Sequence, residues 1–181
     1  SGATVLTAQY WGKKDITTIE KILALAIKSA IFVTFLFTIA ALAIPGILMK
    51  IFTNDPQVIA QGIQYLRVVA FSYILMGITQ VYLYTMRSVE RVLIATCVYL
   101  SSLICNIILN AIFIFGMFGF PALGVRGAAL ATLISRCLEL FIVMIYAHFY
   151  NQEIRFRFHY LFHTEVILWK DFLTYSIPVV L

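Results

Sequence analysis

Charged residues are so widely spaced in this chain that its uncharged runs are long enough to cross a membrane. Three such runs occupy residues 29–49, 68–86 and 92–125, which hold 21, 19 and 34 residues. A helix that crosses the hydrocarbon core needs about 20 mostly apolar residues. The spacing therefore predicts a chain that crosses a bilayer several times.

The composition excludes an ordinary soluble domain. Of the 181 residues, 62% are hydrophobic and only 12% are charged, whereas a globular domain is roughly half apolar and about a quarter charged. A soluble fold of this length has too little interior to hide so much apolar surface. The three cysteines lie inside apolar runs, which indicates buried hydrophobic residues and not a disulfide framework.

The apolar runs are predicted to be helices, because they are long and do not alternate as the strands of a membrane barrel do. A helix also satisfies its own backbone hydrogen bonds, which lipid requires. Apolar character continues to Leu181, so we expect an excerpt of a larger bundle. The expected parts are membrane helices within residues 1–150 (about 22–49, 57–86, 92–118 and 125–149), a connector (151–167) and the start of a further membrane helix (168–181).

The distribution of Lys and Arg predicts which segments face the cytoplasm, because cytoplasmic loops carry an excess of these residues. If the four spans alternate, nine basic residues fall on one side and only Lys50 and Arg126 on the other. We therefore expect a multi-pass protein of the plasma membrane with residues 1–21, 87–91 and 151–167 in the cytoplasm. The nine are Lys13, Lys14, Lys21, Lys28, Arg87, Arg91, Arg155, Arg157 and Lys170.

Asn106 and Asn110 lie four residues apart, so both are expected on one face of a membrane helix. Amide groups in hydrocarbon cost free energy unless they are hydrogen-bonded. Two interpretations remain open. The amides form hydrogen bonds between helices, worth about 1 kcal/mol, or they line a polar cavity for a substrate or an ion.

Arg136 and Glu139 are three residues apart in the middle of the fourth predicted span and can pair on one helix face. A charge at the bilayer centre costs at least about 2.5–3.5 kcal/mol, so the pair must face the bundle interior or water. The pair either holds helices together or belongs to a cavity. A Glu139 that stays paired with Arg136 would be a poor proton carrier.

Thr132 lies one helical turn before Arg136, within a stripe of small residues. Such a stripe is typical of close helix packing, and contact between Thr132 and a substrate is the second interpretation. The stripe comprises Gly127, Ala128, Ala131, Thr132 and Ser135.

Basic and aromatic residues alternate over 155–163, which suits a segment that lies on the anionic inner leaflet of the membrane. His159 and His163 have the spacing of metal ligands on a helix, but no third ligand is evident, so we expect no metal site. We also expect no cofactor, no nucleic-acid partner and no enzyme activity. No Walker lysine motif, nucleophile elbow or paired histidine–glutamate signature is present.

Several segments, taken in order, resemble parts of the multidrug and toxic compound extrusion (MATE) transporters. The order and spacing of these segments carry the resemblance, which covers almost the whole chain. The segments are 1–15, similar to the linker after the second helix of the family; 52–56 and 65–67, similar to the turn into the fourth; 106–110 and 114–116, similar to the fifth; and 124–132 with Arg136 and Glu139, similar to the sixth.

The resemblance implies about twelve helices in two six-helix lobes, of which this chain holds helices three to six, the inter-lobe connector and the start of helix seven. It implies export of cationic, amphipathic organic compounds in exchange for sodium or protons, by alternating access. Residue by residue, Asn106, Asn110 and Thr132 match the polar cavity of the first lobe. Many relatives have an aspartate where this chain has Asn110, and because a neutral amide cannot carry a proton, coupling could rest on the second lobe.

Three other functions remain as alternatives. A flippase for lipid-linked oligosaccharides would need a strongly cationic cavity, for which only Arg136 and Arg67 qualify. A membrane-embedded enzyme acting on lipid would need clustered acids, histidines or metal ligands at the interface. A scaffold subunit without transport would leave the charges at depth unexplained.

Overall fold

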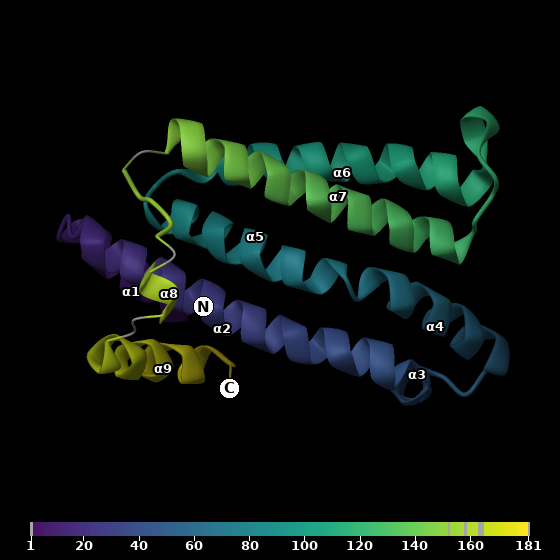
Figure 1. Ribbon diagram of the computed structural model, residues 1–181, viewed down its shortest axis with the longest axis horizontal. Helices are drawn as coiled ribbons and strands as arrows, with labels where there is room; N and C mark the ends of the chain where they lie inside the picture. The colour runs from purple at the N-terminus through teal and green to yellow at the C-terminus, as the bar shows by residue number, and fades with distance from the viewer. Residues whose placement is uncertain (1, 152, 158, 163–164, 181) are drawn as a thin grey trace. The chain divides into compact units, whose positions relative to one another are not determined.

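The computed structural model describes residues 2–151, 153–157, 159–162 and 165–180, and the regular elements in this part of the chain are helices. The predicted all-α class is thereby confirmed. The elements are α1 (Gly2–Gly12), α2 (Ile16–Ala43), α3 (Pro45–Phe52), α4 (Pro56–Val69), α5 (Ser72–Ser88), α6 (Val92–Phe115), the 3-10 helix η1 (Met117–Gly119), α7 (Val125–Ile145), the π-helix η2 (Tyr146–Tyr150), α8 (His159–Phe162) and α9 (Val166–Val180) (Figure 1).

Within the described residues, three helical segments are long and apolar enough to cross a membrane: α2, α6, and α7 continued by η2. The bent pair α4 and α5 passes the same test when its two helices are taken together. The chain divides into two compact units. The connector unit comprises residues 1–31, 77–98 and 141–181, and the pocket unit comprises residues 32–76 and 99–140.

In the connector unit, α1 packs against α9 (Figure 1). The buried side chains of Leu6, Ile22 and Leu168 form an apolar cluster there, and Phe172 packs against this cluster. Leu168 of α9 is thus covered, whereas the neighbouring Val166 and Ile167 are exposed.

Asp15 caps the first turn of α2. Its carboxylate accepts hydrogen bonds from the Thr18 hydroxyl at 2.6 Å and from the Thr18 backbone N–H at 3.2 Å. These two hydrogen bonds, the hydroxyl foremost, hold the pKa of Asp15 below its ordinary value. The cap explains why α2 begins upstream of residue 22, where the apolar run begins.

In the pocket unit, α3 packs against α4 (Figure 1). Pro45 occupies the first turn of α3, and Pro56 that of α4. A backbone N–H in the first turn has no partner within the helix, so its absence in proline costs nothing there. Asp55 caps α4 by accepting a hydrogen bond from the Gln57 backbone N–H at 2.9 Å. The turn residues therefore act here as local sequence patterns predict.

The second predicted span is divided into α4 and α5, which are bent by 56°. Two hydroxyl groups donate hydrogen bonds to backbone carbonyl oxygens at this break. Ser72 Oγ donates to the Val69 oxygen at 2.6 Å, and Thr38 Oγ1 donates to the Ala70 oxygen at 3.1 Å. Such donors make a kink tolerable in lipid. Because Thr38 lies on another helix, the apolar run alone does not predict this break.

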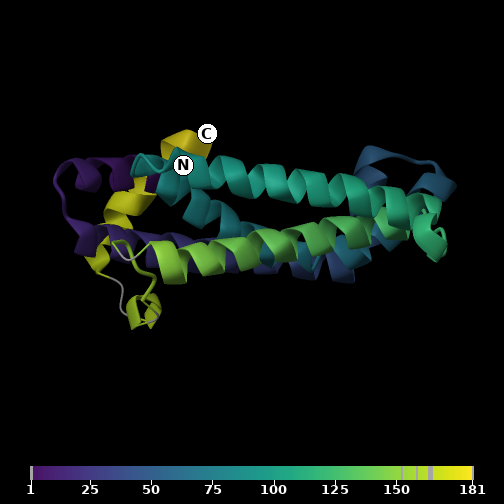
Figure 2. The ribbon, with the colours of Figure 1, turned by 90° about the horizontal axis from the view of Figure 1, so that it is seen from above.

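The α6 helix ends at Phe115, earlier than predicted, because Gly116 adopts a left-handed φ of 71° that favours glycine. Both views show the loop that joins α6 to α7 (Figure 1, Figure 2). The Leu123 backbone N–H donates to the Phe113 oxygen at 2.8 Å. A Cβ at Gly127 would lie 2.5 Å from that same oxygen, so glycine alone permits this approach of the two helices.

Candidate functional site

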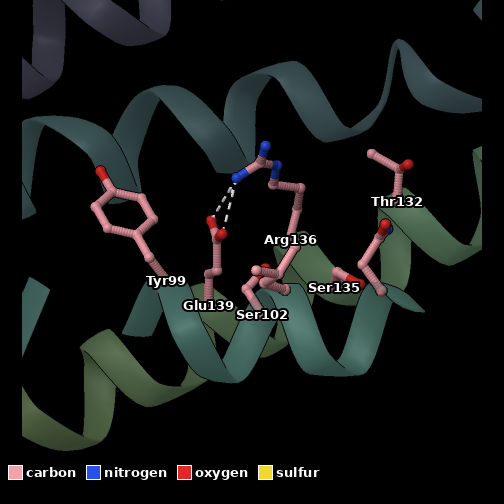
Figure 3. A pocket seen from close by; sticks show the side chains of 8 residues that line it. Tyr99, Ser102, Thr132, Ser135, Arg136 and Glu139 are labelled. Carbon is pink, nitrogen blue, oxygen red and sulfur yellow. Dashed lines mark hydrogen bonds and ion pairs between the residues drawn. The ribbon is translucent and has the colours of Figure 1, made fainter. Parts of the chain in front are cut away.

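A cavity of about 260 Å³ lies between α6 and α7 in the pocket unit. Most of the residues that line it carry a polar group, although both helices are apolar overall. Figure 3 shows side chains from the two helices around it. Four of the five residues proposed from the sequence line it, namely Asn106, Thr132, Arg136 and Glu139, together with Tyr99, Ser102, Leu103 and Ser135.

Arg136 and Glu139 form the ion pair that their spacing predicts (Figure 3). Arg136 Nη1 donates to both carboxylate oxygens, at 2.8 and 2.9 Å. The Glu139 side chain is 2% exposed and that of Arg136 is 28% exposed. A carboxylate buried this deeply requires a hydrogen-bonded countercharge. The Glu139 carboxylate is therefore buried, whereas part of the Arg136 side chain is accessible in the cavity wall.

A seam of small residues on α7 explains the burial of Glu139. Gly127, Ala131, Ser135 and Glu139 follow one another at intervals of four, and all four are buried. Residues four apart share a helix face, and small side chains let a neighbouring helix approach closely. Glu139 is the last residue of this seam, so it is buried on the face of α7 that permits close helix packing.

The two asparagines of α6 are bonded to each other. Asn110 Nδ2 donates to Asn106 Oδ1 at 2.9 Å. Asn110 is not part of the cavity wall, and its own Oδ1 is buried with no hydrogen-bond partner among the described residues. The Asn106 amide N–H groups also make no hydrogen bond in the described part of the chain. Asn110 thus occupies the oxygen of Asn106, and the N–H donors stay unused in a side chain that lines the cavity.

The hydroxyl groups of α7 in the wall donate within their own helix. Thr132 Oγ1 donates to the Ala128 oxygen at 3.0 Å, and Ser135 Oγ donates to the Ala131 oxygen at 2.8 Å. Only the lone pairs of these hydroxyls remain for a ligand.

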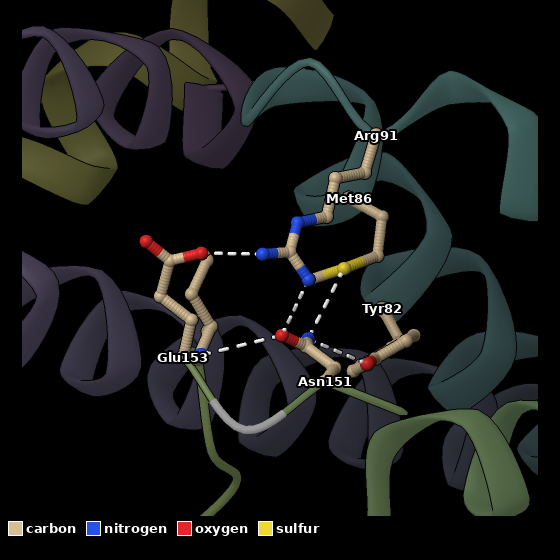
Figure 4. A network of polar contacts seen from close by, with 6 residues as sticks. Tyr82, Met86, Arg91, Asn151 and Glu153 are labelled. Atoms are coloured by element: carbon tan, nitrogen blue, oxygen red, sulfur yellow. Dashed lines mark hydrogen bonds and ion pairs between the residues drawn. The ribbon is translucent and has the colours of Figure 1, made fainter. Parts of the chain in front are cut away.

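A second buried polar cluster centres on Asn151 in the connector unit (Figure 4). The Asn151 side chain is fully buried. Its Nδ2 donates to the Tyr82 hydroxyl at 2.9 Å and to Met86 Sδ at 3.3 Å. Its Oδ1 accepts from Arg91 Nη1 at 2.9 Å and from the Ile154 backbone N–H at 3.3 Å. The sequence did not predict this cluster, because a single asparagine after an aromatic run carries no recognisable signal.

Glu20 fixes the connector to α2. Its carboxylate, on a residue that is 5% exposed, accepts from the Arg155 backbone N–H at 2.9 Å and from Arg157 Nε at 3.1 Å. Arg91, at the start of α6, pairs with Glu153 of the connector. The expected placement of residues 155–163 on anionic lipid stays a prediction, and within this stretch Arg157 pairs with the carboxylate of Glu20.

No group of three or more His, Cys, Asp or Glu side chains in the described part of the chain is placed to hold a metal ion. His159 starts α8, whereas His163 lies outside the described residues. Cys97, Cys105 and Cys137 are all free thiols, but Cys97 and Cys137 are exposed, so the predicted burial is wrong for these two.

Sequence comparison relates the chain to one family. The sequence profile of the MatE family matches residues 1–112. A probable multidrug resistance protein of Bacillus cereus, NorM, is 30% identical over 97% of this chain and 39% of its own length. A probable multidrug resistance protein of the same name from Thermotoga maritima is 30% identical over 86% of this chain and 33% of its own length. The chain thus spans between a third and two-fifths of the length of these relatives.

Solved structures share the fold. One is an inward-facing multidrug resistance MATE family transporter of the MOP superfamily, with a TM-score of 0.85 and 19% identity over 98% of this chain and 39% of that one. Another is a MOP superfamily transporter from Pyrococcus furiosus whose binding pocket is described as reversed in polarity, with a TM-score of 0.84 and 20% identity over 98% of this chain and 38% of that one. The chain therefore belongs to the MatE family, a family of multi-pass membrane transporters and not of enzymes, and its helices match part of the MATE fold.

Proposed function

We propose that the full-length protein is a secondary active antiporter that exports small organic compounds in exchange for sodium or protons, by alternating access. The observation that carries this proposal is the polar cavity between α6 and α7, with an ion pair in its wall, in a chain of the MatE family. Charged groups at this depth cost free energy, so their retention favours a functional cavity. The relatives described as multidrug resistance proteins support organic substrates.

We assign Asn106, Thr132, Arg136 and Glu139 to the cavity that binds substrate or ion, with Asn110 behind Asn106. The cavity volume of about 260 Å³ lies just below the roughly 300–1,000 Å³ of sites for drug-sized ligands. The cavity therefore fits part of a substrate, and the resemblance to MATE transporters supports a second lobe that encloses the rest. The substrates that the resemblance implies are amphipathic organic cations.

The proposed topology places the protein in the plasma membrane with residues 1–21, 87–91 and 151–167 in the cytoplasm. The excess of Lys and Arg in these segments supports it. In this topology, residues 1–150 supply membrane helices of the first lobe, 151–167 the connector between the lobes and 168–181 the start of the next membrane helix.

The test is ethidium accumulation in bacteria that lack their own efflux pumps and express the full-length gene. Cells with the wild-type protein are expected to accumulate less dye, and to lose this advantage when the sodium and proton gradients are collapsed. Asn106→Ala and Glu139→Ala are expected to raise accumulation. Thr96→Ala is the matched control, because Thr96 is exposed on α6 outside the cavity and donates only to its own helix. Unchanged, gradient-independent accumulation in all strains would contradict the proposal.

A further inference from the structure

We infer that one exposed face of α4 lines a water-filled path from the outer surface of the membrane to its middle, and that Arg67 at the inner end of this path attracts anions. The inference concerns a surface outside the cavity between α6 and α7, and it does not depend on the export of any compound. It uses the membrane location of the family and the proposed topology, which places the start of α4 on the outer side. This polar face of α4 comprises Gln57, Gln61, Gln64 and Arg67.

The polar face is continuous along the helix. Its members follow one another at intervals of four, three and three residues, and all of them are exposed. Residues at these intervals share one side of a helix. The opposite side is apolar, since Ile59 and Leu66 are half-buried there and Val69 is buried. The helix is therefore amphipathic, and its polar side is the one that the chain leaves uncovered.

Two other membrane helices of the pocket unit expose the opposite kind of side chain. Ile104 and Ile107 on α6 and Phe32 on α2 are each more than half exposed. Along α4, all of whose residues are described, Val58 is the one large apolar side chain that is exposed. Exposed apolar surfaces suit lipid, whereas polar and charged groups at membrane depth face protein or water. The surroundings of α4 therefore differ from those of α2 and α6.

The side chains of the polar face have no partners of their own. They make no hydrogen bond and no ion pair in the described part of the chain. A buried amide without a partner costs free energy, and an arginine at the bilayer centre costs more. Extension of Arg67 along the helix to the membrane surface would satisfy the arginine alone, and not Gln61 and Gln64, whose side chains are shorter. Water along the whole face satisfies all of them.

The polar face covers about half the thickness of the membrane. Ten residues separate Gln57 from Arg67, which is about 15 Å at 1.5 Å per residue, and the hydrocarbon core is about 30 Å thick. The face ends close to the bend of 56° between α4 and α5 (Figure 1). Beyond the bend, the exposed residues Phe71 and Met76 are apolar again. The path therefore begins at the outer surface and ends near Arg67.

Arg67 makes the inner end of the path positive. It is the only charged residue of the polar face, and a guanidinium is not deprotonated in proteins. The carboxylate closest to it in the sequence, that of Asp55, lies at the outer start of α4 and accepts from the Gln57 backbone N–H. A charge in a low-dielectric surrounding focuses its field along the water-filled space. The ligand class that fits is a small monovalent anion, or the anionic group of a solute.

Cysteine labelling in intact cells tests the path. The full-length protein, with its native cysteines replaced, carries Gln64→Cys and is treated with methanethiosulfonates that do not cross membranes. Ile108→Cys is the matched control, because Ile108 is exposed on α6 at a similar number of residues from the outer helix end. Gln64→Cys is expected to react at least about tenfold faster than Ile108→Cys, since a thiol reacts as its thiolate, which requires water.

Two results would overturn the path. The first is a Gln64→Cys protein that reacts no faster than Ile108→Cys in cells, although it reacts fully in SDS, because another helix of the protein would then cover the polar face. The second is reaction of Gln64→Cys only after the cells are permeabilised, which would place the opening on the inner side.

The role of the Arg67 charge is tested with two reagents at Gln64→Cys. The rates of the anionic 2-sulfonatoethyl and the cationic 2-(trimethylammonio)ethyl methanethiosulfonate are each divided by the rate with a free thiol in solution. The anionic reagent is expected to be favoured, and Arg67→Gln is expected to lower the ratio of the two rates at least about threefold. Arg67→Lys keeps the charge and should retain most of the ratio. An unchanged ratio in Arg67→Gln, or an equal fall in Arg67→Lys, would overturn the attraction of anions by this charge.

Labelling requires no transport, so the inference and the proposed export function fail separately. Reaction at Gln64→Cys without ethidium export by the wild-type protein would contradict export alone. Ethidium export by the wild-type protein without reaction at Gln64→Cys would contradict the path alone.

Discussion

Asn151 in the connector unit directly follows the helix η2, and Asn106 in the pocket unit lies inside the helix α6. Both asparagines adjoin apolar residues along the chain, yet their surroundings differ. Asn151 is fully buried, and its amide bonds to Tyr82, Met86 and Arg91 as well as to the backbone at Ile154. Asn106 is half-buried, lines a cavity and accepts one hydrogen bond, from Asn110, while its N–H donors are unused in the described part of the chain.

Unused hydrogen-bonding capacity, and not polarity alone, therefore separates a candidate binding site from a structural cluster. A buried polar network that is fully satisfied makes its surroundings rigid. A network with unused donors carries a desolvation cost until something binds it. The Arg136–Glu139 pair is an intermediate case, because the hydrogen-bonding capacity of its acid is used and that of its base is only partly used.

The largest effect on stability is expected when the Glu139 carboxylate loses Arg136. Arg136→Met strands the buried Glu139 carboxylate, so the free energy of unfolding should fall by about 3 kcal/mol. Thermal unfolding of the full-length protein in detergent measures this loss. The double variant Arg136→Gln with Glu139→Gln should recover most of the stability. Equal stability of Arg136→Met and the wild type would show that Glu139 does not depend on Arg136.

The same substitution in the two clusters tests the comparison itself. Asn151→Ala leaves Arg91, the Tyr82 hydroxyl and the Ile154 amide without their partner, and should lower the free energy of unfolding by about 2–3 kcal/mol. Asn106→Ala removes a half-exposed side chain and takes one acceptor from Asn110, so it should cost about 1 kcal/mol, less than Asn151→Ala. Thermal unfolding measures both variants side by side. A larger loss for Asn106→Ala would invert the comparison.

A smaller effect is expected at the edge of the satisfied cluster. Glu20→Gln weakens the contact with Arg157, whose side chain is 51% exposed, so the effect on overall stability should be within about 1 kcal/mol. The connector should nevertheless open more often, and trypsin should cleave after Arg157 faster in the folded protein. Glu165→Gln is the control, because it loses only the exposed pair with Lys21. Identical cleavage rates in the two variants would argue against Glu20 as the anchor.

The smallest effect concerns the cap of α2. The pKa of the Asp15 carboxyl is lowered in the folded protein by the Thr18 hydroxyl and amide, so its contribution is present above its ordinary pKa and disappears as the pH falls through the lowered value. The protection of the Thr18 amide, that is, its hydrogen exchange relative to the intrinsic rate at each pH, should therefore fall in acid in the wild type. In Asp15→Asn, which caps without titrating, protection should not change with pH over this range. Equal acid sensitivity in both would exclude Asp15 as the cause.

Local patterns predicted much of this structure. The apolar runs and the pairing of Arg136 with Glu139 follow from residues close together in sequence. Helical spacing likewise places Thr132, Arg136 and Glu139 close together on α7, whereas the meeting of these residues with Asn106 of α6 depends on how the two helices pack.

Contacts between distant residues were not predictable in this way. Glu20 meets the connector across 135 and 137 residues, and the α4–α5 break depends on Thr38 from another helix. The position of Asn110 behind Asn106 was equally hidden, because spacing gives a shared face and does not say which side chain reaches the cavity.

The affinity of correctly folded Asn106→Ala for rhodamine B, a dye with a free carboxylate that accepts hydrogen bonds, tests the central claim most directly, with Asn151→Ala as its counterpart. Both proteins are purified at full length, and binding is measured per folded molecule. Asn106→Ala is expected to unfold at a temperature closer to that of the wild type than Asn151→Ala does, and to bind the dye several-fold more weakly, in line with the loss of one hydrogen bond. Asn151→Ala should show the reverse, with lower stability and unchanged affinity. Wild-type affinity in Asn106→Ala would contradict the claim that the unused donors between α6 and α7 serve a ligand.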